Sequence, residues 1–61
     1  GGKMKVYCVW EEYETDDDLC LTNLLGIYHL QTIAEESCEE WKKIETNSKY
    51  SYYVTEEEVQ W

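Results

Sequence analysis

The side chains best suited to nucleophilic or metal chemistry are few and widely spaced. They are three cysteines and one histidine: Cys8, Cys20, Cys38 and His29. A structural zinc site normally has four Cys or His ligands with a close pair, and a secreted disulfide framework has an even, denser set of cysteines. His29 has no nucleophile at a recognisable motif spacing. The sequence therefore predicts no enzyme, no metal and no cofactor, with reduced thiols packed as small apolar groups in a cytoplasmic protein.

Carboxylates are abundant. The 61 residues include 14 acidic and 5 basic side chains, for a formal net charge of −9. This charge disfavours direct binding to nucleic acid or anionic membranes, and it favours a partner protein with a basic surface. Paired carboxylates can perform acid–base chemistry, but the pairs here are typical of solvated faces. The candidate acidic surface comprises Asp16, Asp17, Asp18, Glu35, Glu36, Glu39 and Glu40.

Two interpretations of this acidity remain open. In the first, the charge only keeps a small protein soluble. In the second, the carboxylates imitate a line of phosphates, and the protein occupies a basic groove of a host enzyme. Asp16 to Asp18 lack the spaced ligands and the glycine of a calcium-binding loop, so we interpret them as a charged turn.

The elements that must position these side chains follow from their periodicity. Residues 4–14 are rich in β-branched and aromatic residues, which indicates a strand. Both of its faces are apolar, one formed by Val6, Cys8 and Trp10 and the other by Tyr7, Val9 and Tyr13. We therefore expect a central strand with neighbours on both sides. A turn follows at residues 15–18, then a second strand over 19–28, in which Asn23 marks a bulge or an irregular start and Gly26 a close backbone approach.

The period changes after this second strand. Residues 30–45 place apolar side chains at helical spacing, with charged residues on the other face. We expect His29 as the N-cap, or Thr32 if the helix begins later. The apolar face consists of Leu30, Ile33, Ala34, Ser37, Cys38, Trp41 and Ile44. A turn at 46–49 then leads to a third strand over 50–59.

This order predicts an α+β fold, β-β-α-β, with a three-stranded antiparallel sheet in the order 2-1-3 and one amphipathic helix on one face. No second helix covers the other face. Exposed apolar surface of this kind usually marks an interface, and a chain this short needs additional stabilisation. The chain has three Trp, six Tyr and no Phe, a composition that suits half-wet interfaces. The candidate interface residues are Tyr7, Trp10, Tyr13, Tyr50, Tyr52 and Tyr53. A homodimer that pairs these faces, or the edge strands, would supply the missing stability.

A loose pattern supports the same order of elements. It begins with the aromatic strand from Val6 to Tyr13, continues with Leu25 to Tyr28, and ends in a helix that contains Ala34-Glu35-Glu36. This pattern resembles short prokaryotic and phage domains of unknown function, from which His29 departs because Ser or Thr would be the expected cap. That resemblance supplies no catalytic residues. In size and acidity the chain is similar in type to small phage anti-defence proteins.

The resulting expectation is a small acidic binding protein without enzymatic activity. It would be a phage-encoded inhibitor of a bacterial host protein, such as an immune factor, and would act as a homodimer in the host cytoplasm. The alternatives are a nucleic-acid mimic and a small metal-binding or enzymatic domain. Residues 1–3 resemble a cloning remnant ahead of Met4, and we expect residues 4–61 to form one domain with no membrane segment.

Overall fold

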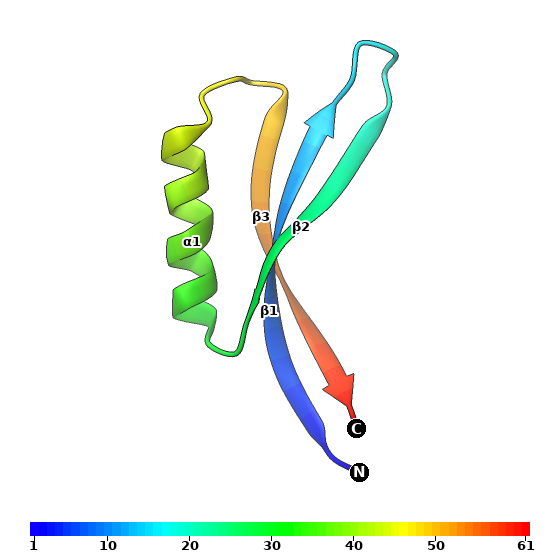
Figure 1. Ribbon diagram of the computed structural model, residues 1–61, viewed down its shortest axis with the longest axis vertical. Coiled ribbons are helices and arrows are strands. Elements are labelled where there is room, and N and C mark those ends of the chain that lie inside the picture. Colours follow the sequence, from blue (N-terminus) through cyan, green and yellow to red (C-terminus); the bar gives the residue numbers. More distant parts are fainter.

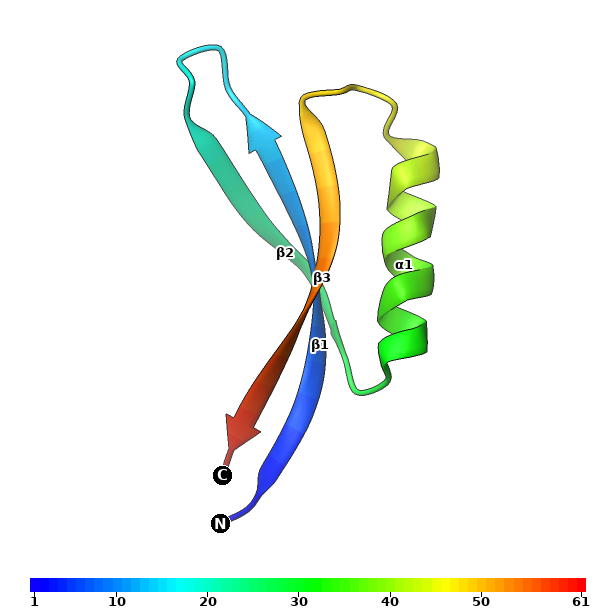
Figure 2. The ribbon, with the colours of Figure 1, turned by 180° about the vertical axis from the view of Figure 1, so that it is seen from behind.

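The computed structural model describes residues 1–61. It contains β1 (Lys3–Glu14), β2 (Cys20–Tyr28), α1 (Gln31–Ile44) and β3 (Tyr50–Gln60). The strands form one antiparallel sheet in the order β2-β1-β3. Figure 1 shows α1 on one side of the sheet and no element on the other, and Figure 2 shows the same two layers from behind. The predicted fold class, strand order and single covering helix are confirmed.

The central strand pairs along most of its length with both neighbours. Tyr7 lies opposite Tyr28 on β2, and Val9 lies opposite Val54 on β3. The pairing of β1 with β2 shifts by one residue, because Val9 opposes Gly26 whereas the next residue opposes Leu24. The extra residue of this bulge is therefore Leu25. The expectation that Asn23 marks the bulge is wrong by two positions.

Alternation along β1 decides which side chains face α1. Val9 is fully buried in a core with Ala34, Cys38 and Tyr52, so odd-numbered positions of β1 point toward the helix. The even positions, Val6, Cys8 and Trp10, point away from it. Because β-strand side chains alternate strictly, the two apolar faces predicted for this strand lie on opposite sides of the sheet.

The helix begins without a side-chain cap. Its N-cap residue is Leu30, with φ −120° and ψ 130°, and the first turn closes through the Ala34 N–H, which donates to the Leu30 carbonyl at 3.2 Å. The predicted caps His29 and Thr32 are therefore wrong. At the other end, Lys42 and Lys43 lie in the last turn, where cations are favoured by the helix dipole.

Small residues bring the helix close to the sheet. Ala34 and Cys38 are its buried residues, whereas Ile33 and Ile44, which we expected in the same contact, are 40% and 72% exposed. The helix is tied to β2 by the Tyr28 hydroxyl, which lies 3.2 Å from Ser37 Oγ. The core is accordingly narrow, since only six of the 61 residues are buried.

The sheet extends well beyond the helix. The molecule is 44 Å long, whereas fourteen helical residues span about 21 Å. Its radius of gyration is 13.3 Å, against roughly 10–11 Å for a compact chain of this length. At one end, Gly2 and Trp61 exchange two backbone hydrogen bonds of 2.8 and 3.1 Å, so the residues before Met4 continue the sheet. The uncovered ends leave apolar side chains of the sheet exposed.

Candidate interaction surface

The face of the sheet that points away from α1 is called the open face. Strand register places on it every side chain aligned with Val6, Cys8 and Trp10. Its large apolar members come from all three strands and from the C-terminal residue: Met4, Val6, Cys8, Trp10, Leu24, Ile27, Tyr53, Val59 and Trp61. Several of them are exposed, including Leu24 at 47% and Ile27 at 58%. The open face therefore exposes apolar side chains from all three strands.

Trp10 is half-buried on the open face. Its indole Nε1 donates a hydrogen bond of 2.7 Å to Oγ1 of Thr55. Thr55 is the cross-strand partner of Cys8, so the indole reaches diagonally along the sheet toward the Cys8–Thr55 pair. Cys8 and Val6 are buried on this face although no helix covers it. The hydrogen bond to Thr55 therefore holds the Trp10 indole at the centre of the open face. We call this held indole the Trp10 platform.

A second indole lies at the end of the same face. Trp61 is 68% exposed and continues the pairing of β3 with the N-terminal residues. A Cβ atom on Gly2 would come within 2.8 Å of Cζ2 of Trp61, so the ring rests on the glycine backbone. Trp61 was absent from the interface residues predicted from the sequence, because the register that places it beside Gly2 is a long-range feature.

Charges are distributed unequally between the two faces. Lys3 pairs with Glu58 at 3.8 Å and Lys5 with Glu56 at 3.9 Å, and alternation places both lysines on the helix side. Glu57 lies opposite Val6 on the open face and has no ion-pair partner.

Glu12, two residues after Trp10, is also on the open face and is likewise unpaired. The open face thus combines aromatic groups with uncompensated negative charge.

The six candidate interface residues do not form one surface. Trp10 and Tyr53 lie opposite each other on the open face. The other four, Tyr7, Tyr13, Tyr50 and Tyr52, lie on the helix side, where the rings of Tyr13 and Tyr50 are 4.7 Å apart. The members that sequence reasoning missed are aliphatic: Met4, Leu24, Ile27 and Val59. Their alternation with Trp10 and Tyr53 is the signal that could have identified them, once the register was known.

Side-chain hydrogen bonds connect the three strands on the helix side of the sheet. Glu11 on β1 accepts from Asn23 of β2 at 3.2 Å and from the Tyr52 hydroxyl of β3 at 3.0 Å. Burial, reinforced by the hydrogen bond and negative charge of Glu11, raises the pKa of Tyr52 to about 12. On the helix side, the Glu11 carboxylate therefore joins all three strands.

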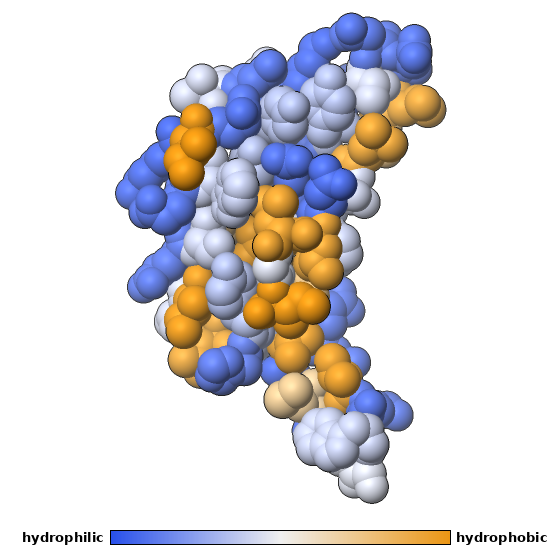
Figure 3. Space-filling view, in the orientation of Figure 1, coloured by the Kyte–Doolittle hydropathy of each residue, from blue (hydrophilic) through white to orange (hydrophobic).

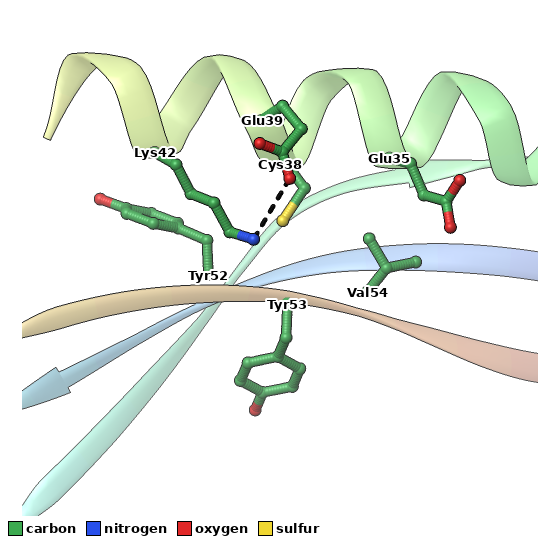
Figure 4. A pocket seen from close by; sticks show the side chains of 7 residues that line it. All are labelled: Glu35, Cys38, Glu39, Lys42, Tyr52, Tyr53 and Val54. Atoms are coloured by element: carbon green, nitrogen blue, oxygen red, sulfur yellow. Dashed lines mark hydrogen bonds and ion pairs between the residues drawn. The ribbon is translucent and has the colours of Figure 1, made fainter.

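An open hollow of about 520 Å³ lies along the junction of α1 and β3. Figure 4 shows Tyr52 and Val54 on its helix side and Tyr53 pointing away from α1. The lining residues are Glu35, Cys38, Glu39, Lys42, Tyr52, Tyr53 and Val54. Burial raises the pKa of the Cys38 thiol, which disfavours the reactive thiolate. The hollow therefore lacks an activated nucleophile.

The candidate acidic residues occupy two separate places. Asp16, Asp17 and Asp18 form the tip of the β1–β2 hairpin, where Asp18 adopts φ 63° and Asp16 pairs with Lys49. Of the helix carboxylates, Glu35 and Glu39 line the hollow between α1 and β3, whereas Glu36 and Glu40 do not. Two of the four are partly neutralised, because Glu39 pairs with Lys42 and Glu40 with Lys43. Figure 1 shows the hairpin tip and the helix as distinct projections. They do not form one continuous acidic line.

The remaining reactive side chains are scattered. Cys8 and Cys38 are buried as predicted, but Cys20, at the start of β2, is exposed, so the expectation that all three thiols are packed is wrong. His29 is exposed in the turn before α1. No group of three or more His, Cys, Asp or Glu side chains is arranged to hold a metal ion.

Comparisons with family models, curated proteins and solved structures found no match. The single helix is too short and too polar to cross a membrane. The geometry of the open face is therefore the principal guide to function.

Proposed function

We propose that this chain is a non-enzymatic binding protein and that the open face holds a basic surface of another protein. The observation that carries the proposal is the hydrogen-bonded Trp10 platform, with Tyr53 opposite it and unpaired Glu57 on the same face. Aromatic side chains supply large contact area at low entropic cost, and they are enriched among the residues that dominate interface energies.

The chemistry of the partner follows from this combination. An arginine side chain stacks on an indole or phenol ring through its planar guanidinium group, and it pairs with carboxylates at the same time. Trp10 and Tyr53 offer the rings, while Glu12 and Glu57 offer the charges. The net charge of −9 accelerates the encounter with a positively charged partner.

The biological setting that fits this chemistry is a phage-encoded inhibitor of a bacterial host protein, such as an immune or defence factor. A small acidic protein acts in this way by covering a basic functional surface of its target. The narrow core supports a binding role, since a domain with six buried residues gains stability from a partner.

The test is affinity purification from a bacterial lysate, followed by mass spectrometry, with matched variants. Tyr53→Ala removes an exposed ring from the open face, and Glu57→Lys reverses its unpaired charge. We expect both variants to lose the captured protein at least tenfold relative to the wild type. Glu36→Gln, on the outer surface of α1, is the control and should retain it.

Three outcomes distinguish the proposals. Loss with the open-face variants alone supports the proposed surface. Loss with Glu35→Gln and Glu36→Gln, together with steep salt dependence, would favour the nucleic-acid mimic instead. Equal capture by every variant would exclude both surfaces.

A further inference from the structure

A long segment of the chain carries no charge. All 14 acidic and all 5 basic residues lie outside residues 19–34, a segment that contains the whole of β2 and the first turn of α1. Figure 3, which views the molecule from the β2 side, shows hydrophobic residues gathered along this strand. Two copies that each carry a net charge of −9 repel one another over most of their surfaces. The β2 edge is where they can approach without bringing like charges together.

The two edges of the sheet differ in their protection. Edge strands present unpaired backbone groups, and natural proteins discourage pairing there with charged side chains. The β3 edge carries Glu56, Glu57 and Glu58 in sequence. By contrast, β2 has nine residues and no charge, and the side chains of Leu21 and Leu24 are about half exposed. Charge therefore protects the Glu56–Glu58 part of the β3 edge, whereas no part of the β2 edge is protected in this way.

The bulge leaves a regular stretch of this open edge. Leu25, the extra residue, packs against the core and shifts the register of the pairing between β2 and β1. The preceding five residues, Cys20–Leu24, pair regularly with β1 on their inner side. They belong to the hairpin arm that splays away from α1, so the helix does not cover their outer side (Figure 1). The centre of this stretch is Thr22.

We propose that a second copy of this chain pairs with β2 along Cys20–Leu24, antiparallel, with the two-fold axis at Thr22. The two sheets then form one sheet of six strands in the order β3-β1-β2-β2-β1-β3. Closed two-fold contacts of this kind use the same surface on both subunits. Pairing converts a marginal three-stranded sheet into a larger one and satisfies the exposed backbone groups of β2.

The symmetry has a geometric consequence for the open face. A two-fold axis that relates antiparallel neighbours in one sheet stands perpendicular to that sheet, so it preserves the two faces. Both helices therefore lie on the same side, and the two open faces join into one continuous surface on the other. Dimerisation through β2 leaves Trp10 and Tyr53 free. Dimerisation through β2 and partner binding by the open face are therefore compatible.

The test introduces a charged side chain at Thr22, where the proposed two-fold axis passes. Thr22 is exposed, and its cross-strand partner within the monomer is Glu12 of β1. Thr22→Lys therefore gains an opposite charge inside the monomer, whereas Thr22→Glu meets a like charge there, and circular dichroism at low concentration checks that both variants fold. In the proposed dimer each new charge lies opposite its own copy, and like charges directly opposite across a strand pair are destabilising. Analytical ultracentrifugation should show a dimer for the wild-type chain, and the dissociation constant should rise at least tenfold for each variant. A mixture of the two variants should recover dimers as a Lys–Glu heterodimer.

Two further measurements separate this dimer from a contact through the open face. Tyr53→Lys should remain dimeric, because Tyr53 lies on the far edge strand. Hydrogen exchange should show amides in Cys20–Leu24 that become protected as the concentration rises into the dimeric range. A wild-type chain that is monomeric at millimolar concentration, or a dimer that is broken by Tyr53→Lys and unaffected by Thr22→Lys, would overturn the proposal. Neither result would by itself refute partner binding by the open face.

Discussion

Tyr52 on β3 donates its hydroxyl hydrogen to Oε2 of Glu11 on β1 at 3.0 Å. The other carboxylate oxygen of Glu11 accepts from Asn23 on β2, so one side chain connects the central strand with both edges. A charge-assisted hydrogen bond at a buried ring contributes more to stability than an exposed ion pair does. This relationship provides a direct test of the helix-side packing.

We expect Tyr52→Phe and Glu11→Gln each to lower the free energy of unfolding by about 1–2 kcal/mol, because each weakens a charge-assisted hydrogen bond. The double variant should be less destabilised than the sum, with a coupling of about 1 kcal/mol. Urea denaturation followed by circular dichroism measures these values. Tyr53→Phe is the matched control, since the exposed Tyr53 hydroxyl makes no such hydrogen bond. Strict additivity of the two changes would show that the hydrogen bond does not form in solution.

The same pair predicts how stability depends on alkaline pH. The pKa of Tyr52 is about 12 in the folded protein, whereas an unfolded tyrosine ionises near roughly 10. The folded state therefore retains a proton that the unfolded state releases, and its stabilising contribution is complete below about pH 10. It is lost as the pH rises from about 10 through 12. Burial of Tyr50 and of the Cys38 thiol raises their pKa values and acts in the same direction.

Urea midpoints measured between pH 9 and roughly 11.5 should therefore fall as the pH rises. The fall should be shallower in Tyr52→Phe than in the wild type. Absorbance at roughly 295 nm should show that one tyrosinate forms later than the rest in the folded wild type. A pH dependence that is identical in the two proteins would contradict this assignment.

Much of the fold followed from periodicity, but the identity of the open face did not. Both faces of β1 are apolar, so the sequence offered no reason to choose the one that α1 covers. The choice is made by long-range packing of Ala34 and Cys38 against Val9 and Tyr52. The candidate interface was consequently divided, with Trp10 and Tyr53 on one side and four tyrosines on the other.

Local residue preferences predicted neither the N-cap of α1 nor the position of the bulge in β2. The helix has no side-chain cap because the Leu30 carbonyl accepts the Ala34 N–H directly, so cap preferences gave the wrong residue. The bulge lies at Leu25, because Leu25 is drawn into the core beside Gly26. The close approach expected at Gly26 was that of a backbone, but the group beside it is the Tyr28 side chain of its own strand.

The contact between the Tyr28 ring and Gly26 predicts the effect of adding a side chain at this glycine. A Cβ atom on Gly26 would lie 2.9 Å from Cε2 of Tyr28, so the ring covers the glycine and cannot stay in place. Its displacement would break the hydrogen bond to Ser37 that ties β2 to α1. We expect Gly26→Ala to lower the free energy of unfolding by about 1–2 kcal/mol despite the higher strand propensity of alanine.

Tyr28→Phe removes the hydroxyl and keeps the ring, so it should cost about 1 kcal/mol. Because both changes act on the same contact, the double variant Gly26→Ala with Tyr28→Phe should show less than additive loss. Thermal and urea denaturation measure the four proteins. Stabilisation by Gly26→Ala alone would mean that the Tyr28 ring does not rest on this glycine.

The last prediction concerns the platform of the open face. Trp10 donates to Thr55, and the ring thereby extends toward the buried Cys8 thiol. Thr55→Val preserves the shape of the side chain but removes the acceptor, which leaves the indole N–H without its partner and costs about 1 kcal/mol. A freed indole exposes Cys8, so iodoacetamide should alkylate Cys8 several-fold faster in Thr55→Val than in the wild type.

Mass spectrometry of the peptides distinguishes Cys8 from the exposed Cys20, which reacts first in both proteins. Thr46→Val, the same substitution in the loop before β3, should leave the Cys8 rate unchanged, and an equal rate in all three proteins would show that Trp10 does not shield the thiol.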